Sequence, residues 1–384
     1  MFKNPYIKAV LISVWFGLLV LPFAGIRTAL LLAGAVLAGS AVIAAFKALG
    51  RAGLFTGVKR AEVLLGSTIE GFTHGPRKAV ALSVILALLL VLPFTANRYT
   101  LDLATQSGIY IVLALGLNIV VGQTGLLVLG YVAFYAVGAY TYALLSTHLG
   151  VSLWASLPVA AILAGIFGLL LGAPTLRLRG DYLAVVTLGF GEITRIVLNN
   201  WDSLTGGPNG ISGVPRPSAG PLIFTSLEHY YFLVLAMAVV TVFVVQRLNN
   251  SRIGRAWIAI REDEVAAEAM GVNTTMLKLL AFALGAVLAG LAGVFYVAKM
   301  GFVSPESFNF LESVIILCMV VLGGMGSIPG VVLGAVVLYL MPEALRDFQQ
   351  YRMLIFGAAM VMMMRFRPQG LIGTKRRGIE MGAE

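Results

Sequence analysis

Apolar stretches long enough to cross a lipid bilayer recur along nearly the whole chain. A membrane-spanning helix needs about 20 predominantly apolar residues. Hydrophobic residues make up 59% of the 384-residue chain and charged residues 11%, and a soluble fold has too little interior to hide so much apolar sequence. The sequence therefore predicts an all-α fold, a polytopic transmembrane helical bundle of about 10–12 spans. The predicted spans are roughly 7–24, 28–47, 78–95, 104–121, 124–146, 154–173, 182–198, 230–246, 276–298, 312–323, 331–342 and 352–365.

The last three apolar segments are shorter than a full span. Gly323, Gly324, Gly326 and Pro329 interrupt what would otherwise be one long segment. Irregular backbone is tolerated at membrane depth only where protein or a water-filled cavity covers it. Broken half-helices are therefore predicted near 312–342, and such pairs of short segments point to a transport path.

The basic residues indicate how the chain is oriented. If the N-terminus is cytoplasmic and the spans alternate, about 20 of the 27 lysines and arginines fall in cytoplasmic segments, as the positive-inside rule expects. This rule accounts for the net charge of +10 without nucleic acid. The chain is therefore predicted to be a multi-pass membrane protein with both termini in the cytoplasm.

Three regions follow from this pattern. Residues 1–100 are predicted to be an N-terminal transmembrane extension with a basic cytoplasmic loop. Residues 101–372 form the core, and residues 373–384 form a basic cytoplasmic tail.

One long charged stretch, residues 252–275, lies between the apolar spans predicted at 230–246 and 276–298. If Arg255 to Gly271 is a single helix, an apolar stripe runs along it with Glu264 in the middle. The stripe consists of Ile253, Ala256, Trp257, Ile260, Ala267 and Gly271. Asn273 is a plausible N-cap for the apolar helix that follows. The pattern predicts a short cytoplasmic helix, tied at both ends to membrane helices and able to face a soluble partner.

The sequence lacks the motifs of several enzyme classes. No Gly-x-x-x-x-Gly-Lys-Ser/Thr phosphate-binding loop occurs, so the chain is predicted to have no ATP site of its own and to be no enzyme. One cysteine and three scattered histidines predict no metal site and no bound cofactor.

Polar residues inside the predicted spans are candidates for function, because they are costly there. Glu192, the main carboxylate within the spans, lies three residues before Arg195, so the two can pair on one helix face. They could line the path or bind the charged ends of a zwitterion, or they could form a neutral pair that positions one helix. Asn118, Gln123 and Thr124 lie at a glycine-rich break, where they could meet a substrate or bond across helices.

From about residue 105 to 372, the chain resembles the LivM-type permeases of branched-chain amino-acid ABC importers. The resemblance rests on Gly116–Gly122, Gly125–Tyr131, Leu176–Glu192, Thr205–Ile211, Gly254–Trp257, Arg261–Asp263, Gly301–Ser307, Val321–Gly326 and Arg367–Leu371. In addition, Glu264-Val-Ala266-Ala267 with Gly271 resembles the EAA…G coupling loop of such permeases. One residue is inserted after the glutamate, and the Ile-x-Leu-Pro ending is absent.

The resemblance implies a location in the bacterial inner membrane. It also implies a complex with a LivH-like second permease, two cytosolic ATP-binding subunits that use the ATP, and a periplasmic substrate-binding protein. It assigns ATPase coupling to Arg255, Glu264, Ala266, Ala267 and Gly271. Leucine, isoleucine and valine are the expected cargo, and relatives that carry urea or short amides are the alternative. A secondary transporter driven by an ion gradient is a further alternative, which would need intramembrane carboxylates.

Overall fold

The computed structural model describes residues 76–176, 178, 180–219, 222–224, 226–344, 357, 361 and 370–372. The chain divides into two compact units, Met1–Leu89 and Leu90–Glu384. The first is described only from residue 76, within α3 (Pro76–Thr95). The predicted spans 7–24 and 28–47, nearly all of 352–365, and the tail 373–384 lie outside the described residues.

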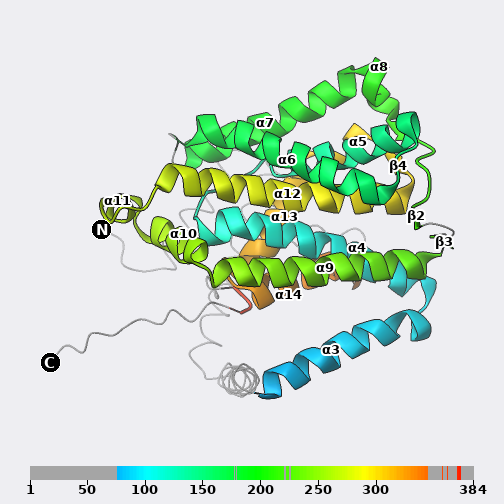
Figure 1. The fold of residues 1–384 in the computed structure, drawn as a ribbon, viewed down its shortest axis with the longest axis horizontal. Coiled ribbons are helices and arrows are strands. Elements are labelled where there is room, and N and C mark those ends of the chain that lie inside the picture. The colour runs from blue at the N-terminus through cyan, green and yellow to red at the C-terminus, as the bar shows by residue number, and fades with distance from the viewer. Residues whose placement is uncertain are drawn as a thin grey trace, which may run out of the picture. The chain divides into compact units, whose positions relative to one another are not determined.

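The second unit is a helical bundle, which confirms the predicted fold class (Figure 1). Its long helices are α4 (Arg98–Leu117), α5 (Val132–Leu149), α6 (Leu153–Thr175), α7 (Asp181–Asn200), α9 (Leu227–Asn249) and α12 (Thr274–Met300). Shorter helices are η1 (Asn118–Gln123), α8 (Asp202–Thr205), η2 (Gly207–Asn209), α10 (Arg252–Glu262), α11 (Glu264–Ala269), η3 (Pro305–Phe308), α13 (Phe310–Gly323) and α14 (Ile328–Ala344).

Four of the described helices are long and apolar enough to cross a membrane: α4 together with η1, α6, α9 and α12. The apolar helices α13 and α14 are shorter. They are separated by the predicted glycine-rich break, where Gly324 and Gly326 have positive φ angles of 112° and 85°. α5 and α7 overlap the predicted spans 124–146 and 182–198, but they are not among the four helices that are long and apolar enough to cross a membrane.

The span predicted at 124–146 begins too early. After η1, the chain is non-helical up to Val132, where α5 starts. Side chains from distant helices hold this stretch: the Leu129 N–H donates to the Thr187 hydroxyl at 3.0 Å, and the Val132 N–H donates to the Ser313 hydroxyl at 3.0 Å. Because neighbouring helices supply hydrogen bonds to this non-helical backbone, apolarity alone did not reveal where the helix begins.

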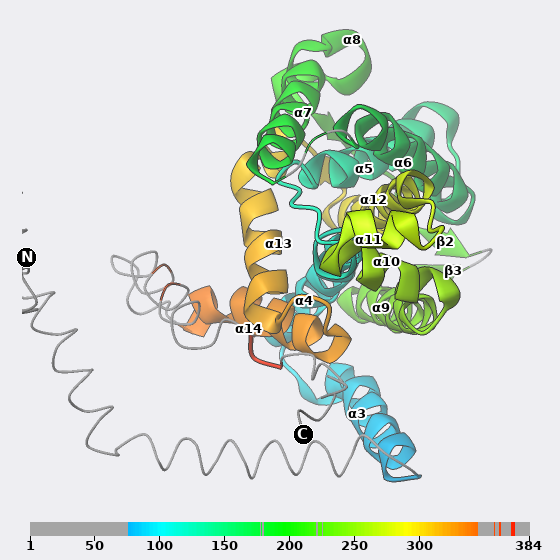
Figure 2. The same cartoon turned by 90° about the vertical axis from the view of Figure 1, so that its left-hand side faces the viewer.

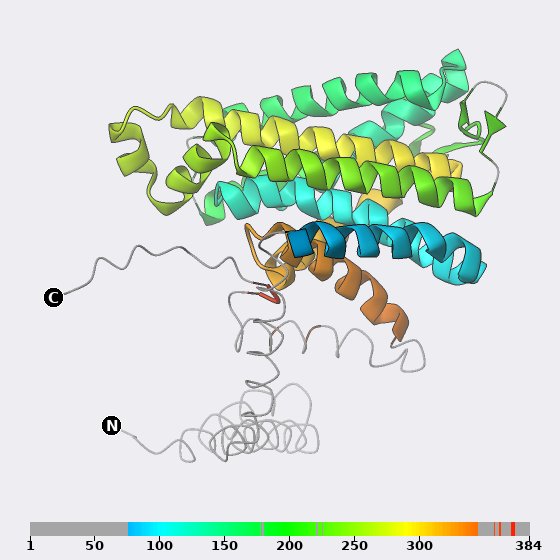
Figure 3. The ribbon, with the colours of Figure 1, turned by 60° about the horizontal axis from the view of Figure 1, so that its bottom comes forward.

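α12 is the central helix, and it packs most extensively against α6 and α5 and also against α4. Figure 3 shows α12, α9 and α4 lying side by side. Glycines allow the close approaches: a side chain on Gly138 of α5 would overlap the backbone of Gly290 on α12. Gly285 of α12 meets Gly116 of α4, where the Tyr131 hydroxyl also donates to the Gly285 carbonyl at 2.8 Å. Small residues and interhelical hydrogen bonds are the usual basis of helix packing in membranes.

Two small antiparallel sheets lie at the opposite end of the bundle from α10 and α11 (Figure 1). In one, β1 (Ile211–Ser212) pairs with β4 (Phe302–Val303), with Ile211 opposite Val303. In the other, β2 (Ser218–Ala219) pairs with β3 (Leu222–Ile223). The first sheet ties the segment after α7 to the segment after α12.

Candidate functional site

The charged segment 252–275 folds as two short helices, so the prediction of one continuous helix is wrong. α10 ends at Glu262, and Asp263 is extended, with φ −155° and ψ 110°. The Asp263 carboxylate accepts hydrogen bonds from the N–H groups of Val265 and Ala266, and it thereby caps α11. Aspartate favours such caps over helix interiors, because its short side chain bonds to nearby backbone N–H groups.

The two helices form a bracket between α9 and α12, at one end of the bundle (Figure 2). Trp257 and Ile260 of α10 and Ala267 of α11 are buried. The indole N–H of Trp257 donates to the Leu277 carbonyl at 2.8 Å, which ties α10 to α12. Asn273 caps α12 by accepting from the Met276 N–H at 3.0 Å, as predicted.

The residues assigned to ATPase coupling differ in their environments. Arg255, Ala266 and Gly271 are exposed and available to a partner. Gly271 has a φ of +84°, a left-handed conformation that ends the bracket and favours glycine. Ala267 faces inward and is 5% exposed. Of the predicted apolar stripe, Ala267 is buried like Trp257 and Ile260, whereas Gly271 is exposed, so the stripe does not form one continuous buried face.

Glu264 forms an ion pair with Lys278 of α12, whose side chain is only 4% exposed. The Glu264 side chain is 25% exposed. Its carboxylate therefore anchors the bracket to α12, a contact that the sequence pattern did not predict.

We expect Glu264→Gln to leave the buried Lys278 ammonium without its counter-charge, and to destabilise the protein by about 3 kcal/mol. Adding Lys278→Met should restore at least half of that loss, because no buried charge then remains unpaired. Thermal unfolding of the purified protein in detergent measures both effects. A double variant no more stable than the single one would contradict this account.

Arg261 connects α10 to the interior of the bundle. Its guanidinium donates to the Gly122 carbonyl in η1, a π-helical turn that continues α4. In the same turn, the Asn118 side-chain oxygen accepts from the Gly326 N–H at 2.8 Å. The bracket, the π-helical turn and the α13–α14 break thus meet through two hydrogen bonds. π-Helical turns are frequent at functional sites.

The three polar residues predicted at the glycine-rich break all lie in or next to η1, and all are buried. Asn118 bonds across helices, and the Thr124 hydroxyl donates to the Val120 carbonyl of its own segment. Neither polar atom of the Gln123 side chain has a hydrogen-bond partner among the described residues. Asn118 thus has the interhelical role that was one of the two interpretations.

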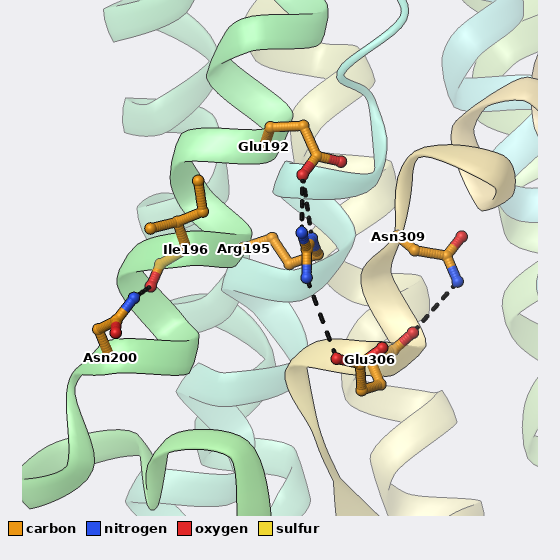
Figure 4. Close-up of polar contacts among 6 residues, drawn as sticks. All are labelled: Glu192, Arg195, Ile196, Asn200, Glu306 and Asn309. Atoms are coloured by element: carbon orange, nitrogen blue, oxygen red, sulfur yellow. Dashed lines mark hydrogen bonds and ion pairs between the residues drawn. The ribbon is translucent and has the colours of Figure 1, made fainter.

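The predicted pairing of Glu192 and Arg195 is present on α7, with 3.0 Å between the Glu192 carboxylate and the Arg195 guanidinium (Figure 4). The guanidinium also lies 4.0 Å from the carboxylate of Glu306 in η3. These contacts favour a pair that positions α7 against η3. The predicted pathway residues therefore lie on two different elements: one pair on α7, and the three polar residues in or next to η1.

A cavity of about 310 Å³ lies among α4, α5, α12, η3, α13 and α14, and the sequence did not predict it. Tyrosines from four of these helices line it: Tyr110, Tyr135, Tyr296 and Tyr339. None of the predicted pathway residues lines this cavity.

The cavity also contains charged groups. Glu312 of α13 accepts a hydrogen bond from the Tyr110 hydroxyl at 2.9 Å. Lys299 of α12 lies 2.9 Å from the Asp102 carboxylate and 3.1 Å from the Gln106 side-chain oxygen. Glu312 is thus a further carboxylate within the bundle, besides Glu192. Glu312 was missed because it lies at the start of a short apolar segment, a place where a sequence normally leaves the membrane.

Comparisons with known proteins agree with the family resemblance. The family model described as the permease component of branched-chain amino acid transport systems matches residues 99–364. The chain is 46% identical to the high-affinity branched-chain amino acid transport system permease protein LivM of Escherichia coli, over 82% of this chain and 79% of that protein. It is 27% identical to a probable LivM of Methanocaldococcus jannaschii, over 70% and 91% of the two chains. It is also 26% identical to the Escherichia coli permease protein LivH, over 70% and 92%. No solved structure matches the chain significantly.

Proposed function

Because the chain belongs to the family of branched-chain amino acid transport permeases, we propose that it is the membrane-spanning subunit of an ATP-driven importer for leucine, isoleucine and valine. ATP hydrolysis is assigned to two separate cytosolic subunits. A LivH-like permease forms the second half of the membrane domain, in line with the sequence similarity to LivH. A periplasmic binding protein delivers the substrate.

The observation that carries this proposal is the bracket of α10 and α11. It joins the last residues of α9 to the first residues of α12, the central helix of the bundle. Its outer residues are exposed, and its inner residues are bonded to α12 and η1. This is the form expected of a lever that a soluble partner can move.

The mechanism is alternating access driven from the cytoplasm. ATP binding closes the ATPase dimer and displaces the docked bracket. Trp257 and the Glu264–Lys278 pair transmit the displacement to α12, and Arg261 transmits it to η1 and thereby to α4. Rigid-body movement of packed helices then re-orients the path between the two permeases. In this arrangement the bracket end of the bundle faces the cytoplasm, and both chain termini are cytoplasmic.

The test is uptake of radiolabelled leucine into proteoliposomes that contain this chain, its co-purified partners and the binding protein. The proposal requires uptake that depends on ATP and that excess urea or acetamide does not inhibit. Inhibition by urea or acetamide would reassign the cargo to the urea and amide class. Uptake by this chain alone, without ATP, would mean an ion-driven transporter and would overturn the proposal.

We expect Gly271→Val to leave the protein folded and inserted but to reduce leucine uptake about tenfold. A β-branched residue is strained at a positive φ, by roughly 1–2 kcal/mol, and the bracket end must therefore rearrange. Gly271→Asn is the matched control, because asparagine tolerates this conformation, and it should retain most of the uptake. Uptake and ATP hydrolysis are measured in the same proteoliposomes. Normal uptake by Gly271→Val would remove Gly271 from the coupling surface.

A further inference from the structure

We infer that the tyrosine-lined cavity binds the zwitterionic head of an amino acid, with the ammonium group at Glu312 and the carboxylate group at the Lys299 end. This inference rests on the proposed function and deepens it by assigning a substrate site within this subunit. The volume of about 310 Å³ lies at the lower end of the range of about 300–1,000 Å³ seen for small-molecule sites.

The Glu312 carboxylate provides the cation site. Among the described residues, it accepts the Tyr110 hydroxyl and forms no ion pair with a lysine, arginine or histidine. A carboxylate within a helical bundle is costly without a counter-charge. A ligand ammonium group would supply that charge and would donate hydrogen bonds to the free carboxylate positions.

The tyrosine rings also favour an ammonium group in the cavity. Tyr110 and Tyr339 have ring centroids 5.0 Å apart, and Tyr135 and Tyr296 have centroids 5.5 Å apart. Aromatic faces attract an ammonium group within about 6 Å of the ring centroid. The apolar parts of the rings also provide a surface for an aliphatic side chain.

Lys299 provides the anion site. Its side chain is 5% exposed and is held by Asp102, whose side chain is 50% exposed. Because the Asp102 side chain is half exposed, it has room to turn away and let a ligand carboxylate take its place beside the ammonium group. The three charged residues of the cavity carry two negative charges and one positive charge, so the lining is net −1. This balance disfavours a simple anion and gives no advantage to uncharged urea.

The experiment measures equilibrium binding of radiolabelled leucine to the assembled permease–ATPase complex in nanodiscs, without binding protein or ATP. Leucinamide lacks the carboxylate, 4-methylpentanoate lacks the ammonium group, and urea lacks both. Unlabelled leucine should displace the label at a concentration at least about tenfold lower than any of these three, because a charge-assisted contact is worth about 1.5–3 kcal/mol.

Variants locate the site. Glu312→Gln should weaken leucine binding about 10- to 100-fold, whereas Glu312→Asp, which keeps the charge, should lose less. Glu228→Gln removes an exposed carboxylate at the start of α9 and should bind leucine normally. Co-purification of the partner subunits shows that each variant has assembled.

The inference is overturned if wild-type complex shows no saturable leucine binding, if 4-methylpentanoate competes as well as leucine, or if Glu312→Gln binds leucine like the wild type. Its failure is distinguishable from failure of the proposed function, which ATP-dependent leucine uptake by the wild type tests independently. Uptake that persists in Glu312→Gln together with unchanged binding would leave the importer intact and remove this site.

Discussion

Replacing Gly138 by leucine is expected to prevent the bundle from reaching its native packing. The Gly138 α-carbon faces the backbone of Gly290 on α12, and even a methyl group there would overlap the Gly290 carbonyl. Both partners are backbone atoms of the two helices, so no side chain can turn aside. α5 must separate from α12, and the expected cost is at least about 3 kcal/mol, the upper end of the usual range for overpacked cores.

The measurement is thermal unfolding and monodispersity of the purified protein in detergent. Gly189→Leu is the matched control, because Gly189 lies within α7 with a normal helical backbone and no atom within 4 Å of the added β-carbon. It should unfold at nearly the wild-type temperature. Equal stability of Gly138→Leu and Gly189→Leu would show that the α5–α12 approach is not a tight constraint.

Replacing Arg261 by alanine is expected to uncouple ATP hydrolysis from transport, with leucine uptake reduced about tenfold or more. The arginine is the direct hydrogen-bonded link from α10 to the Gly122 carbonyl in η1. A hydrogen bond from a charged donor is worth about 1.5–3 kcal/mol, which corresponds to at least about a tenfold change in an equilibrium constant. Without this bond, a displacement of the bracket should shift the conformational equilibrium of η1 about tenfold less. Basal ATP hydrolysis should persist, because the exposed bracket residues that we propose to contact the ATPase are unchanged.

The control for Arg261→Ala is Arg247→Ala, which removes an exposed positive charge near the end of α9. Uptake, basal ATP hydrolysis and hydrolysis stimulated by binding protein are measured for both variants in proteoliposomes. Arg261→Lys keeps the charge but lacks the planar guanidinium, so partial uptake is expected. If Arg261→Ala retains full uptake, movement reaches the bundle through Trp257 and Lys278 alone.

Two helices, α12 and α4, connect to the bracket at one end and also contribute residues to the cavity. α12 carries Lys278 near one end and Lys299 near the other, and α4 continues into η1 at one end and contributes Tyr110 to the cavity. A displacement at the bracket therefore reaches elements that line the cavity. This shared framework is the physical reason why we propose that movement of the bracket is coupled to a substrate in the cavity.

The sequence alone determined the features that depend on local chemistry. Apolar runs placed α6, α9 and α12 within a few residues of their observed bounds, because a bilayer requires each helix to be apolar over its own length. Glycines placed the break between α13 and α14, and Asn273 capped α12, because caps and turns depend on a few adjacent residues.

Only the tertiary structure shows which residues far apart in the sequence are in contact. The bond between Arg261 and Gly122 spans 139 positions, and that between Tyr110 and Glu312 spans 202. Hydropathy records how apolar each residue is, but not which helix face meets which neighbour. The non-helical stretch before α5 likewise depends on hydrogen bonds to Thr187 and Ser313, which only the folded chain supplies. The division of the bracket at Asp263, by contrast, rests on a local cap that aspartate favours, and it could have been predicted from the sequence. The cavity could not be predicted for the same reason. Its tyrosines, Glu312 and Lys299 are single residues on separate helices, and they form a site only when those helices pack.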